Sequence, residues 1–332
     1  MLLFALDASR PFGERVAAAL GLELAAHEER EFEDGEHKVR PLVGVRGHDV
    51  YVVQSLHGGP DASPDDKLCR LLFFIATLRE HGAARVTAVV PYLAYARKDR
   101  QTKPRDPVTT RYVAALFEAA GVGRVMTLEV HNVAAFQNAF RCETVHLDLR
   151  RLFMPAARAL AGAPPGTAKL VVASPDPGGV KRAQLFREAL EADLGRPVGA
   201  AYMEKRRSAG VVSGDLLVGD VEGALMLVID DLVASGGTMM RAARAAREHG
   251  AVSVHAVAVH GLFTGAAERV LGDAVLTGMM VSDTVPPFRL SPTFAAERLE
   301  VVSAAPLVAA AIERCHGHGS ISNLLEDTPS AY

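Results

Sequence analysis

Apolar and polar positions along this chain follow two patterns. Short apolar runs are typical of β-strands, and longer amphipathic runs are typical of α-helices. In the first half the two kinds of run alternate regularly. The predicted strands cover residues 2–6, 50–54, 86–90 and 125–129, and the predicted helices cover 13–20, 65–81 and 108–120. Strands that alternate with helices in this way are typical of α/β proteins with largely parallel sheets.

A second series of the same kind begins with the strand LVVAS, directly after Lys169. Its further strands are predicted at 224–229, 254–259 and 274–280, and its helices at 180–190, 238–249 and 306–316. A boundary is expected within 148–166, where AGAPPG at 161–166 is rich in helix and strand breakers. We therefore expect domains at 1–149 and 150–311, with a C-terminal helix and tail at 312–332 that packs back on the first domain.

Composition is compatible with two folded domains and narrows the classes of function. The 332 residues are 49% hydrophobic and 23% charged, which is enough for two ordinary cores. No apolar run approaches the roughly 18–20 residues of a membrane span, and no secretory signal pattern opens the chain, so we expect a cytoplasmic protein without a membrane partner. The net charge of -3 argues against a nucleic-acid partner. Cys69, Cys142 and Cys315 form no CxxC pair, which argues against a disulfide framework or a zinc site.

The segment VIDDLVASGGT at 228–238 joins a buried strand to a predicted helix and carries two adjacent acids and two glycines. Open parallel sheets bind ligands at the carboxyl ends of their strands. Backbone N–H groups of a glycine turn can bind a phosphate there, and adjacent carboxylates suit the vicinal hydroxyls of a ribose. A capped strand-to-helix turn without a ligand is the alternative. The candidate residues for a ribose phosphate are Asp230, Asp231, Ser235, Gly236, Gly237 and Thr238.

This loop resembles the phosphoribosyl-pyrophosphate loop of type I phosphoribosyltransferases and of ribose-phosphate pyrophosphokinases. Only the second family also resembles the rest of the chain, through segments that occur in order over nearly its whole length. They are FEDGE at 32–36, VRGHDVYVVQS at 45–55, PYLAYARKDR at 91–100, EVHNVAAFQNAF at 129–140, SPDPGGVKRA at 174–183, EKRR at 204–207 and SDTV at 282–285. The resemblance implies two tandem type I phosphoribosyltransferase-like domains, each a mainly parallel sheet flanked by helices. It places ATP on the first domain and ribose 5-phosphate on the second.

In FEDGE, Phe32, Asp34 and Glu36 stand at alternate positions, so in an extended hairpin their side chains share one face. An aromatic ring beside two acceptors can stack on a purine and accept hydrogen bonds from its exocyclic amine. The alternative is a turn with Asp-Gly chemistry and one core phenylalanine. The family resemblance implies that the three residues contact the adenine of an ATP held mainly by a neighbouring subunit.

Two further segments carry candidate ATP and metal contacts. Arg97 and Lys98 follow a predicted buried strand, where cations can bind a triphosphate, although a solvated loop is the alternative. The resemblance implies that Arg97 contacts ATP, while Lys98 stands where a glutamine is usual. His131 and Asp176 each follow a strand, and a lone histidine is most often structural. The resemblance implies instead that both help to hold the Mg²⁺ that accompanies ATP.

EKRR precedes a stretch rich in glycine, serine and aspartate that is typical of a loop or hairpin rather than a core element. Phosphoryl transfer needs cations near the oxygens over which negative charge spreads, although such residues can also be plain surface charges. By position, Lys205 and Arg207 match the catalytic lysine and arginine of the family.

The resemblance as a whole implies a ribose-phosphate diphosphokinase that uses Mg²⁺, ATP and ribose 5-phosphate and releases AMP. It also implies a homo-oligomer built from dimers, which in the family often assemble into hexamers. Two alternatives stay open. A type I phosphoribosyltransferase shares the acid loop but would not need FEDGE or EKRR. A non-catalytic, synthetase-like regulatory subunit would not need the proposed metal and catalytic residues, although Ala234, where the family most often has an acid, leaves room for it.

Overall fold

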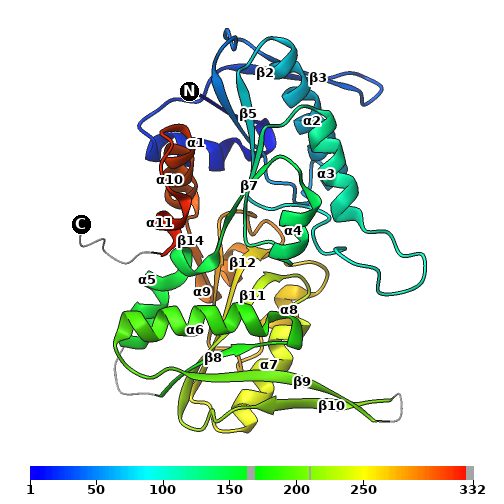
Figure 1. Ribbon diagram of the computed structural model, residues 1–332. Coiled ribbons are helices and arrows are strands. Elements are labelled where there is room, and N and C mark those ends of the chain that lie inside the picture. Colours follow the sequence, from blue (N-terminus) through cyan, green and yellow to red (C-terminus); the bar gives the residue numbers. More distant parts are fainter. Residues whose placement is uncertain (163–168, 209–210, 327–332) are drawn as a thin grey trace. The chain divides into compact units, whose positions relative to one another are not determined.

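The computed structural model describes residues 1–162, 169–208 and 211–326 (Figure 1). For residues 205–208 and 211–215 it describes the backbone alone. The chain forms two compact units. Unit 1 comprises Met1–Asp148 and Ala304–Tyr332, and unit 2 comprises Leu149–Ser303. Each unit is an α/β structure with a mainly parallel sheet, as the alternation of apolar patterns predicts. No helix in the described ranges is long and apolar enough to cross a membrane.

Unit 1 is built on a five-stranded sheet with the order β1-β4-β5-β6-β7, in which all neighbouring strands are parallel. Its strands are β1 (Leu2–Ala5), β4 (Asp49–Val53), β5 (Arg85–Val90), β6 (Arg124–Leu128) and β7 (Glu143–Leu147). Its helices are η1 (Asp7–Ser9), α1 (Arg10–Ala19), α2 (Pro64–Glu80), α3 (Thr109–Ala119), α4 (Val133–Ala139), α10 (Ala305–His316) and α11 (Ile321–Glu326). A separate antiparallel hairpin pairs β2 (His27–Glu31) with β3 (His37–Pro41).

Helix α2 illustrates how local sequence sets the boundaries of these elements. Ser63 caps its first turn by accepting a hydrogen bond from the Asp66 N–H, and the Asp66 side chain accepts one from the Ser63 N–H, which completes a capping box. Apolar residues at helical spacing, including Leu71 and Phe74, face a core that they share with Val52 of β4 and Phe117 of α3. The helix predicted at 65–81 is therefore confirmed within one residue at each end.

Helix α10 follows the last strand of unit 2 in the chain but packs within unit 1, where it contacts α1 (Figure 1). Its buried residues, among them Val308 and Ile312, begin at its first turn, so the whole helix belongs to unit 1. The predicted division placed residues 304–311 with the second domain, whereas unit 1 takes in the chain from Ala304.

The C-terminal end of α10 is fixed to the sheet by one carboxylate. Asp49, at the start of β4, accepts two hydrogen bonds from Arg85 at 2.7 and 2.8 Å, one from the Tyr51 hydroxyl and one from His316 Nδ1 at 2.9 Å. Burial alone would raise the pKa of Asp49, but the bonds from Arg85 and His316 outweigh it and lower the pKa to about 2. The ionised form is therefore stabilised by folding. That contribution is complete above pH about 4 and is lost as the pH falls towards 2.

Replacing Asp49 by asparagine is expected to lower the free energy of unfolding at pH 7 by about 1–3 kcal/mol, because the Arg85 guanidinium loses its charged partner. Urea denaturation followed by circular dichroism measures the change. Glu28→Gln is the matched control, because Glu28 pairs with Arg40 and Lys38 at an exposed site and its loss should leave the curve unchanged. Equal effects of the two variants would contradict the role given to Asp49.

Unit 2 contains a seven-stranded sheet with the order β10-β9-β8-β11-β12-β13-β14. All pairs are parallel except β9 with β10, which form an antiparallel hairpin at one edge. The strands are β8 (Lys169–Ser174), β9 (Gly199–Ser208), β10 (Val211–Val218), β11 (Ala224–Val233), β12 (Ser253–Gly261), β13 (Gly278–Ser282) and β14 (Leu299–Val302). The helices are α5 (Leu149–Gly162), η2 (Pro177–Gly179), α6 (Val180–Leu194), α7 (Gly237–Glu248), α8 (Ala267–Leu271) and α9 (Pro292–Arg298).

The strand predicted at 274–280 is wrong in its first half, since β13 begins at Gly278. Asp273 holds a turn there, because its side chain accepts a hydrogen bond from the Val275 N–H and its carbonyl accepts one from the Leu276 N–H. Leu276 is nevertheless buried in the core of unit 2. An apolar residue that a turn places in the core gives the same sequence signal as one that a strand places there.

Candidate functional site

Two adjacent acids lie at the carboxyl end of β11, in the middle of the sheet of unit 2. The pairing of β11 with β8 ends at Val228, but its pairing with β12 continues, with Asp230 opposite Ala258. On the β8 side, therefore, Asp230 and Asp231 extend past the last paired residue of the neighbouring strand. This is the edge at which open parallel sheets bind ligands.

Arg182 of α6 lies between the two acids. Its Nη1 is 3.4 Å from Asp230 Oδ1 and 3.4 Å from Asp231 Oδ1, and its side chain is only 13% exposed. Burial raises the pKa of Asp230 well above its ordinary value, the neighbouring charge of Asp231 raises it further, and Arg182 opposes both effects. Asp230 Oδ1 also accepts the Asp231 N–H at 2.9 Å. The pair thus forms a poorly hydrated acidic site, suited to accepting hydrogen bonds from ligand hydroxyls.

The loop after this pair opens a helix, as the sequence predicts. Gly236 has a positive φ of 81° and precedes α7, which begins at Gly237. A Cβ at Gly236 would lie 2.7 Å from side-chain carbons of Leu271 on α8, so only glycine fits there. In the described structure no side chain caps α7, which leaves the N–H groups of its first turn available to an anion, with Ser235 and Thr238 beside them. The Ala234 carbonyl accepts the Thr264 N–H at 2.9 Å and anchors the loop to the chain after β12.

Asp176 follows β8 and precedes η2. Its Oδ1 accepts the N–H groups of Gly178 and Gly179, at 2.8 and 3.1 Å, so the carboxylate caps this short helix. A Cβ at Gly179 would lie 2.7 Å from Ser174 Oγ, which shows how tightly the turn is packed. Among the described contacts none uses Asp176 Oδ2. One oxygen of Asp176 therefore shapes the turn, and the other can face a ligand.

Lys205 and Arg207 lie on β9, in the hairpin that the composition of this stretch favours over a core element. Their backbones pair with Asp215 and Val212 of β10, and the ladder is irregular between those two partners. Their side chains lie outside the described part of the structure, as do residues 209–210. The hairpin is thus established, whereas the catalytic role predicted for these two cations stays a prediction.

In unit 1, FEDGE forms the turn of the β2–β3 hairpin rather than an extended stretch. The Phe32 N–H donates to the Glu36 carbonyl at 2.7 Å, the Asp34 side chain accepts the Glu36 N–H, and Gly35 has a φ of 88°. Strand alternation therefore does not decide which way Phe32, Asp34 and Glu36 face, and that part of the sequence interpretation is wrong. The Asp-Gly step selects the turn instead. All three side chains are exposed, and the Arg30 guanidinium lies over the Phe32 ring, 5.1 Å from its centroid.

The segment after β5 contains Arg97 and Lys98. Arg97 is exposed, whereas the Lys98 ammonium is bound within the chain, 2.5 Å from Asp106 Oδ2. Tyr95 just before them has a positive φ of 63°, and its hydroxyl donates to Asp65 on α2. Conformations of this kind occur at sites where the surrounding structure holds a loop in one arrangement. The two predicted ATP residues thus differ, since one cation faces solvent and the other is part of the loop.

His131 is exposed at the carboxyl end of β6, two residues after Glu129, which has a positive φ of 33°. Asn132 caps α4 through its Oδ1, and its Nδ2 donates to Asp99 Oδ2 at 2.6 Å. That bond joins the loop after β6 to the loop after β5. The structure therefore brings the segment of His131 and the segment of Arg97 together at one edge of the sheet.

One further group in the described chain, Asp7, His27 and Glu29, has potential metal-ligand atoms within 4.8 Å of one another. Each acid already has cationic or N–H partners. Arg10 binds Asp7 at 3.1 Å, and His27 Nε2 lies 3.1 Å from Glu29 Oε1. Burial would raise the pKa of Glu29, but hydrogen bonds from His27 and the Asp7 N–H outweigh it, so the pKa is lowered. This is the arrangement of an ion-pair network rather than of a vacant metal site.

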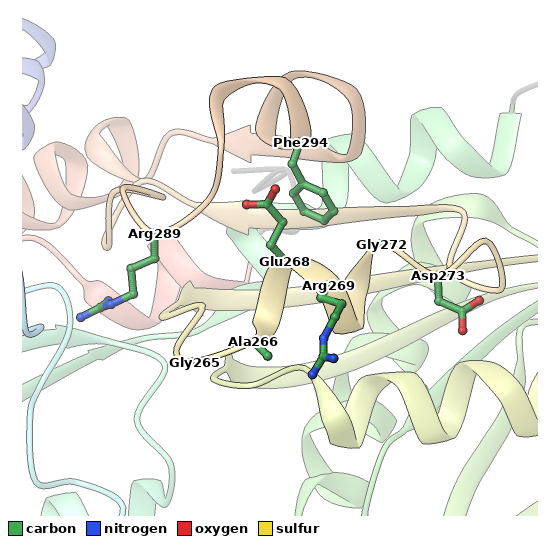
Figure 2. Close-up of a pocket in the computed structure, with 8 residues that line it drawn as sticks. All are labelled: Gly265, Ala266, Glu268, Arg269, Gly272, Asp273, Arg289 and Phe294. Carbon is green, nitrogen blue, oxygen red and sulfur yellow. The ribbon is translucent and has the colours of Figure 1, made fainter.

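A surface pocket of about 830 Å³ lies beside α8 in unit 2 (Figure 2). Its two acids, Glu268 and Asp273, accept hydrogen bonds from neighbouring protein groups. Figure 2 shows the side chains of Arg269 and Arg289 extending in different directions, so their charges do not converge. Within the described chain, its lining includes none of the residues 230–238. The pocket is therefore distinct from the glycine loop.

Residues 1–121 match the sequence profile of the N-terminal domain of ribose phosphate pyrophosphokinase, and residues 212–326 match that of the phosphoribosyl synthetase-associated domain. The chain is 37% identical over 327 residues to the ribose-phosphate pyrophosphokinase of Caldanaerobacter subterraneus subsp. tengcongensis, covering 97% of this chain and 96% of that one. It is 35% identical to the enzyme of the same name from Hyphomonas neptunium, covering 98% and 100%. The chain belongs to the ribose-phosphate pyrophosphokinase family.

The crystal structure of phosphoribosylpyrophosphate synthetase from Mycobacterium smegmatis is similar to this pyrophosphokinase family member, with a TM-score of 0.83 and 31% identity. The match covers 96% of this chain and 99% of that one. The family predicted from the eight short segments is thus confirmed, together with the fold of its units.

Sequence reasoning missed one residue of this candidate site. Arg182 stands inside the segment SPDPGGVKRA, but only Asp176 was singled out there. A signal was present, because a basic residue in the first turn of a helix is unfavourable beside the positive end of the helix dipole. Arg182 at the third position of α6 therefore calls for an acidic partner, and the structure supplies Asp230 and Asp231.

Proposed function

We propose that this chain transfers the β,γ-diphosphate of ATP to the 1-hydroxyl of ribose 5-phosphate, which yields phosphoribosyl pyrophosphate and AMP. The observation that carries the proposal is a pair of adjacent acids, one buried and one partly buried, beside an uncapped helix start at the carboxyl end of β11. A sugar phosphate offers hydroxyls to carboxylates and an anion to free N–H groups, and this edge offers both kinds of partner.

In unit 2 the proposed ligand is ribose 5-phosphate. Its 5-phosphate binds the backbone of 235–238 and the hydroxyls of Ser235 and Thr238, while its ring hydroxyls donate to Asp230 and Asp231. Arg182 orients the two carboxylates, and its positive charge offsets the repulsion between them. Lys205 and Arg207 supply the positive charge that stabilises the transferring diphosphate.

In unit 1 the proposed ligand is ATP, with Arg97 on the triphosphate and the residues of FEDGE on the adenine. The exposure of Phe32, Asp34 and Glu36 on a projecting hairpin turn supports adenine contacts with the ATP of a neighbouring subunit. A homo-oligomer built from dimers, and in the larger form a hexamer, is therefore part of the proposal.

His131 and Asp176 remain the proposed protein contacts of Mg²⁺, each described within its own unit. An exposed imidazole and a carboxylate with an unengaged oxygen fit a metal whose other ligands are phosphate oxygens and water. When bound, Mg²⁺ neutralises charge on the polyphosphate.

The protein groups of the proposed mechanism position substrates rather than form covalent bonds. The ribose 1-hydroxyl oxygen forms a bond to the β-phosphorus as the bond from that phosphorus to the α-phosphate oxygen breaks, and AMP leaves with the electron pair. The hydroxyl proton passes to solvent. Holding the two substrates in line removes most of the entropic barrier, and cations offset the charge on the equatorial oxygens.

The direct test is incubation of the purified chain with ATP, Mg²⁺ and ribose 5-phosphate. We expect AMP and phosphoribosyl pyrophosphate to appear in equal amounts, and no AMP to appear when ribose 5-phosphate is omitted. A type I phosphoribosyltransferase would instead form no AMP and would consume added phosphoribosyl pyrophosphate with a base. A regulatory subunit would do neither.

A further inference from the structure

Among the described contacts of the proposed ATP segment, the ammonium of Lys98 pairs with a carboxylate of the same chain. Its Nζ lies 2.5 Å from Asp106 Oδ2 and 3.1 Å from Thr102 Oγ1, and its side chain is 31% exposed. Its backbone is also held, since the Lys98 carbonyl accepts the N–H and the hydroxyl of Thr110 at 3.4 and 3.2 Å. Both ends of Lys98 are therefore fixed by neighbouring protein groups.

Asp106 is the centre of this arrangement. Besides Lys98, its Oδ2 accepts the Thr102 hydroxyl at 2.7 Å, the Thr102 N–H at 3.1 Å and the Lys103 N–H at 3.0 Å. The Asp106 carbonyl accepts Gln101 Nε2 at 2.9 Å. The ammonium of Lys98, followed by the Thr102 groups, lowers the pKa of Asp106, so the carboxylate is ionised at neutral pH. One carboxylate oxygen thus closes residues 98–106 into a single loop.

The neighbouring arginines are arranged differently. In the described structure neither Arg97 nor Arg100 makes an ion pair, and both are exposed. Between them, Asp99 accepts Asn132 Nδ2, which attaches this loop to the segment that carries His131. The loop therefore fixes one lysine and one aspartate against each other and leaves two guanidinium groups available at the sheet edge.

We propose that Lys98 is a positioning residue: its pair with Asp106 closes the loop 98–106 and holds Arg97 and Arg100 for the triphosphate, without Lys98 itself touching ATP. The proposal rests on the proposed function for the place of ATP, but not for the loop itself.

The kinetic test compares Lys98→Gln, Asp106→Ala and the double variant with the wild type. We expect each single variant to raise KM for ATP roughly tenfold, because an open loop holds the arginines poorly. The double variant should be no worse than either single one, because both changes break the same pair. Neither kcat nor KM for ribose 5-phosphate should change by more than about twofold. Lys98→Arg keeps the pair and should restore KM for ATP.

If Lys98 were a direct ATP ligand, Asp106→Ala would release its charge and leave KM for ATP unchanged or lower it. That outcome, or fold-changes of the two single variants that multiply in the double variant, would overturn the proposal. Thermal midpoints of all variants separate loop opening from general unfolding.

Limited trypsin digestion tests loop closure independently of catalysis, since Arg100 and Arg105 are exposed cleavage sites within the loop. Cleavage there should be faster in Asp106→Ala than in the wild type, whereas Lys98→Arg should resemble the wild type. Equal rates in wild type and Asp106→Ala would contradict loop closure. If the wild type formed no AMP, the proposed function would be contradicted. The digestion result would then still test closure of the loop 98–106.

Discussion

Replacing Asp230 by asparagine is expected to lower kcat by about 10²–10³-fold while ATP binding stays within about twofold of wild type. The amide keeps the size of the side chain but replaces one of the two carboxyl oxygens that are proposed to accept the ribose hydroxyls with an NH2 donor. ATP is proposed to bind unit 1, so its affinity should not depend on this acid. Turnover is measured as AMP release, and ATP affinity by calorimetric titration without ribose 5-phosphate.

The Asp230→Asn variant should be as stable as the wild type or more stable. The pKa of Asp230 is raised in the folded chain by burial and by Asp231. A raised pKa means that the folded state favours the protonated form, so the ionised acid costs stability once the pH rises above the ordinary value near 3.8. At pH 7 an asparagine removes that cost. Lost turnover without lost stability is the expected result for a residue kept for its chemistry.

Asp273→Asn is the matched control in the same unit. Hydrogen bonds from the Val275 N–H and Arg244 lower the pKa of Asp273, so its charge is favoured by folding, which is the opposite sign to Asp230. Removing it should not raise the thermal midpoint and should leave kcat unchanged. If Asp230→Asn kept wild-type turnover, or if both variants lost activity equally, the assignment of the acid pair to ribose would fail.

The fold was largely predictable because its elements are set by local periodicity. The strands on both sides of α2 are short apolar runs, and α2 itself carries its own capping box and a buried stripe. The strand predicted at 274–280 was wrong in its first half because a turn held by Asp273, and not a strand, places Leu276 in the core. Periodicity reports burial, and burial alone does not distinguish a turn from a strand.

The site was predictable where its chemistry is contiguous in sequence, as in the glycine loop after Asp231. It was missed where partners are distant. Arg182 meets Asp230 from 48 residues away, and only the sheet topology brings α6 to the end of β11. Lys98 was predicted as an ATP contact from its charge near the end of a strand, and that contact stays a prediction. Its partner Asp106 could not be predicted, because the pair follows only from the closure of the loop. FEDGE was misjudged because the turn preference of Asp-Gly prevails over strand alternation.

Substitutions at Gly236 and Gly237 should distinguish the effect of backbone geometry from the effect of contact with the ligand. Gly236→Ala is expected to lower the free energy of unfolding by about 2–4 kcal/mol, because it combines a strained positive φ with a close contact to buried Leu271. The loop shifts when that strain is relieved, so KM for ribose 5-phosphate should rise as well. Thermal unfolding and initial-rate kinetics measure the two effects.

Gly237→Ala is the natural comparison. Its φ is not in the left-handed region, and the nearest atom to a Cβ there is Ser235 Oγ at 3.8 Å, so the folded chain has room for it. Alanine in the first turn of α7 should leave the thermal midpoint unchanged or raise it slightly, by up to about 1 kcal/mol of stability. A rise in KM for ribose 5-phosphate at unchanged stability then means that the phosphate approaches this backbone closely. Wild-type kinetics for Gly237→Ala, with equal loss of stability in both variants, would mean that the loop is only a structural turn.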